Sequence, residues 1–327
     1  SSTDMSHILL MLFSAFGALG NWIFFCISAW YMIQNNKFSP NKWIKLLFQV
    51  WFVSVTVLIV IFLVKPNELS VELIIKSVFP TIFSNNWYMS CFLLFYLIFP
   101  NLNILIASLG EKKLFVASVG MFFVYFVLGF AKSDVMFSSP LILWTSVYFI
   151  VAYIQKYTDY KSSNIIQIRL LIIGITGHIT ITLATNYLGL FIPFVGSQVL
   201  RWACNSNPFI LCIAISLVLI CIKKSYSNFL FDKIAGCSML IYIIHENYLF
   251  AKLFRGKILV WLFENVGYNR LLICVLLMTI VLFVGSLIIS WIFKGVFSIL
   301  YKIFDCVLSN KLDLGSCSYV DFGKGEY

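Results

Sequence analysis

Three polar side chains follow a strongly apolar segment, and their residue types could carry out acid–base chemistry. Residues 238–244 are Ser-Met-Leu-Ile-Tyr-Ile-Ile, and His245, Glu246 and Asn247 follow directly. A histidine, a carboxylate and an amide lose hydration at the end of a membrane-spanning segment, so ionisable groups there indicate a functional site. A histidine that only hydrogen-bonds a neighbouring helix explains the same spacing, and both interpretations stay open at this point.

The composition identifies the environment of these residues. Of the 327 residues, 61% are hydrophobic and only 11% are charged, and the mean hydropathy is +0.96. A soluble domain of this length is far less apolar. Apolar runs of about 20 residues recur, which is the length of a spanning helix, and the alternation typical of a membrane barrel is not found. The sequence predicts an all-α, polytopic integral membrane helical bundle.

We expect nine spans in one domain. They cover approximately residues 8–33, 43–64, 84–106, 113–131, 139–155, 169–189, 207–222, 233–250 and 271–293. A single transmembrane domain would then occupy residues 1–304. Residues 305–327 are rich in Gly, Ser and charge and are expected to form a polar cytoplasmic tail.

Basic residues are unequally divided between the two sides of this arrangement. One set of alternate loops, together with the C-terminus, carries 15 of the 23 Lys and Arg residues. The positive-inside rule therefore predicts a cytoplasmic C-terminus in the inner cell membrane and, with nine spans, residue 1 outside. A chain that starts outside without an initiator Met predicts a missing first helix and ten spans in the complete protein. Topology also explains the net charge of +10 better than nucleic-acid binding does, because no basic face forms.

The nine cysteines predict neither a disulfide framework nor a metal site. All but Cys204 fall in expected spans or on the cytoplasmic side, and one outer thiol cannot build a framework. No Cys and His spacing suits zinc. We therefore expect no metal and no bound cofactor.

Helical spacing groups the polar residues of the eighth expected span. On a period of 3.6 residues, Ser238, Tyr242 and His245 share one face, and Glu246 and Asn247 point away from it. Because this span runs outward, His245 is expected in its outer half.

A second polar group begins the third expected span on the outer side. Asn85 and Asn86 precede Trp87, and planar amides beside an aromatic surface suit the recognition of sugar hydroxyls. An interfacial aromatic belt with polar anchors explains the same residues. Arg201, in another outer loop, is assigned to the same outer zone.

A third group lies in the sixth expected span, where His178, Thr182 and Thr185 follow one another at i, i+4 and i+7. We consider an intramembrane polar relay through His178 and Thr182. Hydrogen bonding between helices is the interpretation that we favour, because Thr commonly has this role in membranes.

Three widely spaced stretches carry a further signal. They are residues 20–30 (GNWIFFCISAW), residues 85–103 with NNWY, LFYL and PNLN, and residues 241–247 (IYIIHEN). In this order they resemble the acyltransferase-3 family of membrane O-acyltransferases, which modify bacterial surface glycans. The resemblance extends over nearly the whole chain.

The resemblance implies a ten-helix fold with an acyltransferase activity. Such a protein takes an acyl group, usually acetyl, from cytoplasmic acyl-CoA and delivers it to a hydroxyl of a cell-surface or polyprenyl-linked glycan. Acyl-CoA is then a co-substrate, and the glycan and membrane lipid are the partners, with no nucleic acid.

The chain departs from the family in three places. The family's first helix carries an Arg and a His about ten residues apart that are held to be essential, and this chain has no such pair. Ser28 is followed by Ala and Trp where the family has Gly and Tyr. Lys42 and Lys45 stand where the family has a cytoplasmic Arg-x-x-Arg. Lysines hold a CoA phosphate as point charges without a bidentate fork, and topogenic charge explains them equally well.

Acyl transfer to a hydroxyl needs a base, donors for the carbonyl oxygen and exclusion of water. Imidazole titrates near neutral pH, so His245, or a histidine in the missing helix, could be the base, with Tyr242 beside it. The donor side would be formed by Lys42, Lys45 and Ser28. The acceptor side would be formed by Asn85, Asn86, Trp87, Glu246, Asn247 and Arg201.

Two other classes of protein fit the same features. A transporter or flippase of lipid-linked sugars would share the spans, the intramembrane histidines and the outer amides. Transporters often contain internal repeats, and none is visible here. A non-catalytic fragment is the third possibility, and a requirement for CoA separates the enzyme from both.

Overall fold

The computed structural model describes residues 5–129, 139–198, 203–224, 228–266 and 268–312. Every regular element in these ranges is a helix, which confirms the predicted all-α membrane class. By length and composition, five of the described helices can cross a membrane. They are His7–Gln34, Pro40–Val64, Trp87–Ser108, Ile165–Leu188 and Arg270–Lys302.

Three further expected spans are also helical. The range 113–131 corresponds to α6 (Glu111–Phe122) and the π-helix η2 (Phe123–Leu128), and its last two residues lie outside the described ones. The range 139–155 corresponds to α8 (Pro140–Tyr157) and the range 207–222 to α11 (Pro208–Ile222).

The expectation of one span over residues 233–250 was wrong, because three short helices cover this range and two further short elements follow them. They are α12 (Phe229–Ala235), α13 (Ser238–His245), α14 (Tyr248–Phe250), the π-helix η4 (Ala251–Arg255) and α15 (Gly256–Asn265). Asparagine side chains provide local reasons for the breaks. Asn228 caps α12 and Asn247 caps α14, each by accepting hydrogen bonds from two backbone N–H groups, and this favours a new helix start over continuation.

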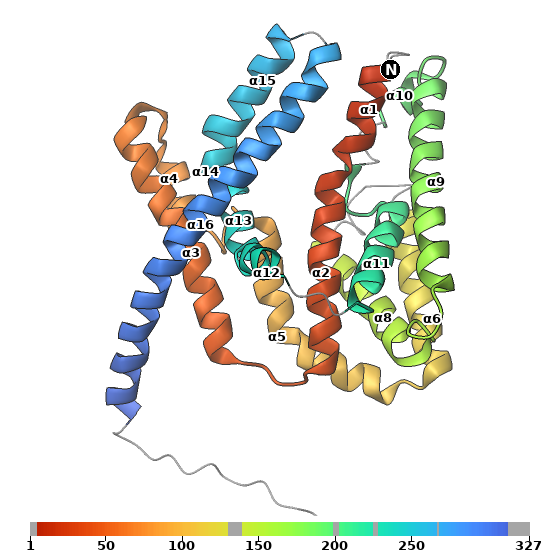
Figure 1. The fold of residues 1–327 in the computed structure, drawn as a ribbon, viewed down its shortest axis with the longest axis horizontal. Helices are drawn as coiled ribbons and strands as arrows, with labels where there is room; N and C mark the ends of the chain where they lie inside the picture. Colours follow the sequence, from red (N-terminus) through yellow and green to blue (C-terminus); the bar gives the residue numbers. More distant parts are fainter. Residues whose placement is uncertain (1–4, 130–138, 199–202, 225–227, 267, 313–327) are drawn as a thin grey trace, which may run out of the picture.

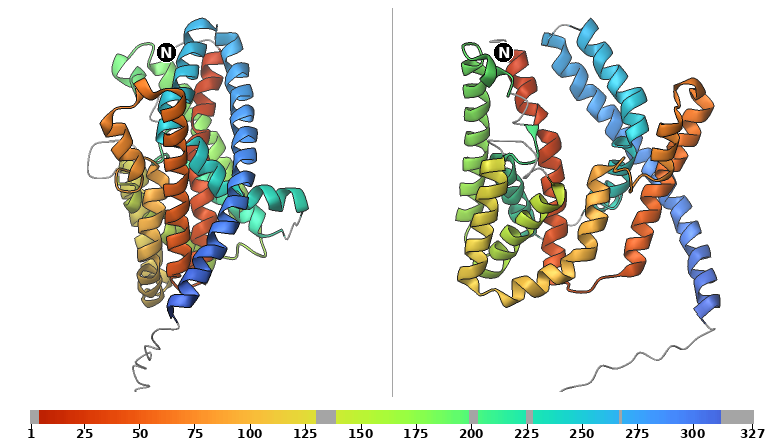
Figure 2. Two further views of the ribbon diagram at one scale, coloured as in Figure 1. Left: turned by 90° about the vertical axis from the view of Figure 1, so that its left-hand side faces the viewer. Right: turned by 180° about the vertical axis from the view of Figure 1, so that it is seen from behind.

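The helices form two neighbouring groups (Figures 1 and 2). In the first, α11 packs against α9 (Ile165–Leu188) and α2 (Phe16–Gln34), and α8 packs against α6 and α2. In the second, α13 packs against α16 (Tyr268–Leu312), and α3 (Pro40–Val64) packs against α4 (Val71–Val78). The helix α5 (Trp87–Ser108) contacts α2, α3 and α8 and so links the groups. The remaining elements are α1 (Met5–Ser14), η1 (Pro66–Glu68) and α10 (Pro193–Gly196).

Aromatic rings form much of the core around α2, α5 and α8. The ring centroid of Trp144 lies 4.4 Å from that of Phe25 and 4.7 Å from that of Tyr88. Tyr148 donates a hydrogen bond to Asn103 at 2.6 Å, and Asn103 donates to the carbonyl of Met32 at 2.9 Å. Burial of large rings holds the three helices together, and the hydrogen bonds of Asn103 join Tyr148 on α8 to the backbone of α2.

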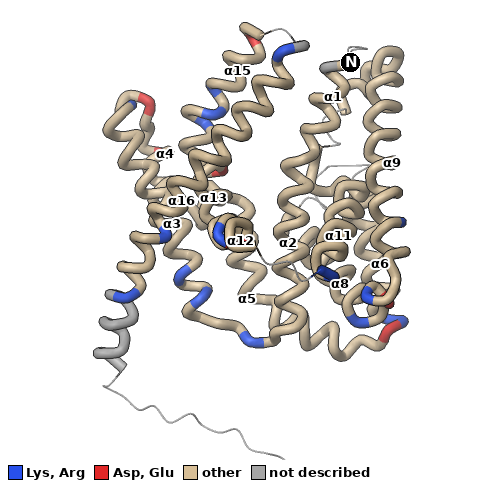
Figure 3. The backbone as a smooth tube through the Cα atoms, in the orientation of Figure 1, with Lys and Arg blue, Asp and Glu red and all other residues tan. Residues whose placement is uncertain are grey.

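The end of the last helix and the positions of the lysines can be compared with the predicted domain boundary and topology. The helix α16 continues to Leu312, past the expected boundary at residue 304, and residues 313–327 lie outside the described ones. Lys37 lies between α2 and α3, and Lys42 and Lys45 lie in the first turns of α3. Figure 3 shows basic residues at its lower edge, where α2 ends and α3 begins. Lys112 and Lys113 begin α6 at the same edge.

An exposed ion pair joins two segments at the opposite end. Lys257 Nζ of α15 lies 2.7 Å from Glu68 Oε2 of η1, and Lys65 Nζ lies 3.5 Å from Oε1. The hydrogen bond from Lys257 is the main reason that the pKa of Glu68 is below its usual range. Exposed pairs of this kind contribute little to stability, so this one adds only a weak link between the segments.

The closest helix pairing depends on glycine. A Cβ atom added to Gly174 of α9 would lie 2.8 Å from the carbonyl oxygen of Phe209 and 2.6 Å from Ile213 Cγ1 on α11. Small residues allow membrane helices to approach in this way, because van der Waals contact replaces the hydrophobic effect as the force between them.

We therefore predict that Gly174→Ala destabilises the protein by about 1–3 kcal/mol through overpacking. The measurement is the thermal unfolding midpoint in detergent micelles. Gly120→Ala is the matched control, because a Cβ there meets nothing within 4 Å. The control should leave the midpoint unchanged or raise it, and equal midpoints for both variants would contradict the close packing.

Candidate active site

A cavity of about 500 Å³ lies among α2, α5, α12, α13 and α16. Apolar surface provides most of its wall, with six aromatic rings among the lining residues, and a few polar groups converge on it, as is usual for a small-molecule site. The rings are Phe16, Phe24, Trp87, Tyr88, Tyr242 and Phe283. The polar side chains are Asn21, Ser238, His245 and Glu246.

The cavity lies near the middle of the membrane-length helix His7–Gln34. Asn21, which lines it, is about 20 Å from either end of that helix at 1.5 Å per residue. That His245 lies in the outer half of the membrane stays a prediction. The single span expected around it is interrupted, because α13 ends at His245 and α14 begins at Tyr248.

The short helix α13 presents Ser238, Tyr242 and His245 to the cavity, as the helical period predicts. Glu246 also lines the cavity, so the prediction that it points away was wrong. The helix ends at His245, and helical spacing does not apply to the residue that follows it. Asn247 is buried as the cap of α14, with its side-chain oxygen 3.1 Å from the backbone nitrogen of Leu249, and is not among the lining residues.

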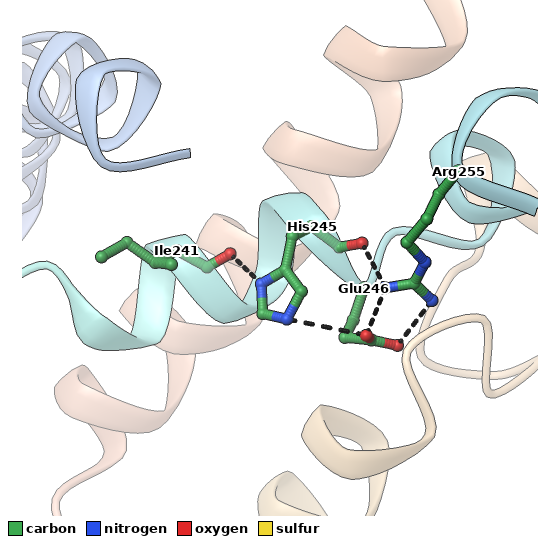
Figure 4. A network of polar contacts seen from close by, with 4 residues as sticks. All are labelled: Ile241, His245, Glu246 and Arg255. Atoms are coloured by element: carbon green, nitrogen blue, oxygen red, sulfur yellow. Dashed lines mark hydrogen bonds and ion pairs between the residues drawn. The ribbon is translucent and has the colours of Figure 1, made fainter. Parts of the chain in front are cut away.

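The hydrogen bonds of His245 define which nitrogen can act as a base (Figure 4). Its Nδ1 lies 2.7 Å from the carbonyl oxygen of Ile241, which can only accept. The Nδ1 atom therefore carries the hydrogen in the neutral ring, and Nε2 keeps a lone pair. The Nε2 atom lies 3.6 Å from Oε1 of Glu246. The pattern leaves a proton acceptor beside a carboxylate at the cavity.

Arg255, the last residue of the π-helix η4, completes this network. Its Nη1 lies 2.5 Å from Oε1 of Glu246 and its Nη2 lies 3.3 Å from Oε2, which is the two-pronged geometry of a guanidinium and a carboxylate. The same Nη1 donates to the carbonyl of His245 at 3.1 Å. The sequence analysis did not select Arg255 as a site residue. Opposite charges nine residues apart in an apolar segment are the signal that could have identified it.

The start of α5 contributes two aromatic residues to the cavity, Trp87 and Tyr88. Tyr88 is 1% exposed, and its hydroxyl has no hydrogen-bond partner among the described residues. Its ring centroid lies 5.1 Å from that of Tyr242. The sequence analysis did not select Tyr88, because a tyrosine next to Trp87 also fits an interfacial aromatic belt.

The two asparagines before Trp87 have structural contacts instead. Asn85 donates to the carbonyl of Lys76 at 2.6 Å, and Asn86 caps α5 by accepting from the backbone N–H of Met89 at 3.3 Å. Neither is among the lining residues. The structure thus brings Trp87 to the cavity, but not the amides expected beside it.

The helix α2 presents a face of small and polar residues that the sequence analysis missed. Gly17, Gly20 and Asn21 line the cavity, and a Cβ atom at either glycine would meet nothing within 4 Å. Asn21 donates to the side-chain oxygen of Asn205 at 3.3 Å. Ser28 lies on the same face about 10 Å further along the helix and donates to the carbonyl of Phe24 at 3.0 Å, outside the cavity.

His178 and Thr182 also lie outside the cavity lining. The Nε2 atom of His178 lies 3.4 Å from the carbonyl oxygen of Leu12, and its Nδ1 lies 3.4 Å from Nδ2 of Asn207. The hydroxyl of Thr182 is buried without a partner among the described residues. These contacts join α9 to α1 and to the start of α11, and they do not connect His178 to His245.

The remaining candidates lie at the start of α3 or outside the described residues. Lys42 is exposed in the first turn of α3. Lys45 lies one turn further, with Nζ 5.0 Å from the ring centroid of Tyr301. Arg201 falls in the range 199–202, which is not described. Within the described ranges, no three His, Cys, Asp or Glu side chains gather to hold a metal ion.

Comparison with known proteins agrees with this architecture. A family model for an acyltransferase domain, that of the acyltransferase-3 family, matches residues 1–295. The chain belongs to this family, and with its helical membrane fold it is a multi-pass membrane acyltransferase. No curated protein and no solved structure matches the chain significantly.

We predict that Gly20→Leu lowers acyl transfer at least about tenfold, because the side chain enters the cavity and displaces whatever binds there. The measurement is the initial rate at matched protein levels. Gly120→Leu on α6 is the control, since it also has no neighbour within 4 Å but does not line the cavity. A Gly20→Leu rate equal to that of the control would show that the cavity is not used.

Proposed function

We propose that the protein transfers an acyl group, usually acetyl, from cytoplasmic acyl-CoA to a hydroxyl of a cell-surface or polyprenyl-linked glycan. The proposal includes a location in the bacterial inner membrane with a cytoplasmic C-terminus. The observation that carries it is the position of His245, whose Nδ1 contacts the Ile241 carbonyl while its Nε2 remains available at a cavity that combines aromatic rings with an amide and a carboxylate. Membership of an acyltransferase family supplies the reaction class.

In this proposal His245 is the general base. Its Nε2 takes the proton of the acceptor hydroxyl as the hydroxyl oxygen attacks the thioester carbonyl. The tyrosine hydroxyls of Tyr242 and Tyr88 are the candidates to donate to the negative oxygen of the tetrahedral intermediate. When the carbon–sulfur bond breaks, the imidazolium returns the proton to the CoA thiolate, and the ester and free CoA leave.

The lining of the cavity supports a sugar as acceptor. Trp87 and Phe24 offer apolar ring faces, and Asn21 offers an amide that can both donate and accept. Asn21 and Trp87 thus provide the combination of amide and aromatic surface that the sequence analysis expected from Asn86. The position of the cavity, far from both ends of the helix, favours acyl transfer over hydrolysis because it limits access of water.

The donor side of the proposal rests on charge. Lys42 and Lys45 lie at the start of α3, where backbone N–H groups and lysines together favour phosphate. Ser28 lies on the α2 face between this end and the cavity, along the path that an acyl group would take.

We predict that His245→Gln lowers acyl transfer by about 10²- to 10⁴-fold, as expected for loss of a positioned base. Glutamine keeps similar bulk and some hydrogen bonding, so packing changes little. The measurement is glycan O-acetylation by membranes that contain the variant at matched levels. His178→Gln is the control, because that histidine is buried between helices outside the cavity. Near wild-type activity of His245→Gln would return His245 to a structural role.

We also predict that Lys42→Ala with Lys45→Ala raises the KM for acetyl-CoA about tenfold, through loss of charge-assisted contacts to phosphate, and leaves kcat nearly unchanged. The exposed pair Lys112→Ala with Lys113→Ala, at the start of α6, is the control for general loss of charge at the same edge. An unchanged KM in the first double variant would leave Lys42 and Lys45 with a topological role only.

A further inference from the structure

We propose that Arg255 is a positioning residue that balances the charge of Glu246, so that His245 stays a neutral base in the resting protein. The proposal rests on the proposed role of His245 as the base. In this proposal Arg255 contacts neither the acyl donor nor the acceptor. It contacts the backbone carbonyl of His245 and the carboxylate of Glu246.

The contacts of Arg255 hold two groups at once. One guanidinium nitrogen, Nη1, reaches the carbonyl oxygen of His245 at 3.1 Å and Oε1 of Glu246 at 2.5 Å. That carbonyl is among the last of α13 and lacks a partner within the helix, and a cation is favourable at this end of a helix. Because one guanidinium group contacts both residues, Arg255 helps to hold Glu246 Oε1 at 3.6 Å from His245 Nε2.

The local geometry explains why Arg255 is the residue in place. It ends the π-helix η4, and π-turns shift the direction of the side chains that follow them. Lys252, the other cation of η4, lies 5.7 Å from the ring centroid of Tyr248. Among the described residues, only Arg255 is shown to pair with Glu246 apart from His245 itself.

The charge of Glu246 has opposite consequences before and after proton transfer. A carboxylate alone at this distance would favour imidazolium and remove the base at neutral pH. Pairing with Arg255 weakens that effect, while the carboxylate still supports the imidazolium once it forms. The other titratable side chains at the cavity are Tyr88 of α5 and Tyr242 of α13, and α2 and α16 contribute the neutral Asn21 and Phe283.

The test uses two variants that should move the pH dependence in opposite directions. In Arg255→Gln, the unbalanced carboxylate should raise the pH at which the acyl-transfer rate falls to half by about one unit or more. In Glu246→Gln, loss of the carboxylate and the remaining guanidinium should lower that pH. Arg255→Lys keeps the charge and loses the fork, so it should keep the wild-type midpoint with a lower kcat. Shifts in the same direction, or no shift, would overturn the proposal.

Lys257→Gln is the matched control. It removes a cation two residues further along the same segment, and its partner Glu68 is at the exposed end and not at the cavity. The control should keep the wild-type midpoint and rate. Thermal unfolding of every variant identifies loss of folding, and rescue of the midpoint by Arg255→Lys shows that charge is responsible.

A second measurement separates this proposal from the proposed function. The chain contains three histidines, so ¹⁵N-histidine NMR of the full chain in detergent, compared with His7→Gln and His178→Gln proteins, identifies the His245 ring signals. Their titration midpoint should move up in Arg255→Gln and down in Glu246→Gln without any substrate. Opposite NMR shifts in a protein with no acyl transfer would overturn the proposed function and keep the charge balance. Unshifted signals in an active protein would overturn the charge balance and keep the proposed function.

Discussion

The site depends on how the protein supplies hydrogen-bond partners to the backbone groups where a helix is interrupted inside the bundle. Hydrocarbon offers no hydrogen-bond partners, so each backbone group released by a break needs one from the protein. Asn247 supplies the partners for the start of α14, and Arg255 supplies one for the carbonyl of His245 at the end of α13. The same break creates the polar end at which His245 and Glu246 line the cavity. One set of contacts therefore both satisfies the backbone at the break and positions the polar groups of the cavity.

The absence of side chains at two glycines of α2 enlarges the cavity, and aromatic residues form the wall opposite them. Gly17 and Gly20 leave space that side chains at most other positions would fill. Opposite them stand Trp87 and Tyr88, which are held by the aromatic core around Trp144. The cavity thus lies between an aromatic wall on α5 and a face of α2 that contains two glycines. This arrangement suits a reaction in which two substrates must meet with little water.

The polar residues of the chain divide into those that line the cavity and those that serve the fold. Asn86 was a candidate for acceptor binding and His178 for a polar relay, because a buried amide or imidazole in a membrane must have a partner. In the structure their partners are the start of α5, the carbonyl of Leu12 and Asn207. Asn21 and Tyr88 line the cavity instead. Their sequence surroundings did not indicate this, because Asn21 lies next to a phenylalanine-rich run and Tyr88 follows a tryptophan.

The sequence by itself determined the membrane class, the approximate positions of the long helices and the shared face of Tyr242 and His245. These follow from local rules, because hydropathy over about 20 residues and a period of 3.6 need no knowledge of neighbours. Only the tertiary structure decided the break after His245, the turn of Glu246 toward the cavity and the reach of Arg255. Each depends on which distant helix supplies a partner for a buried polar group, and that is a property of packing and not of spacing along the chain.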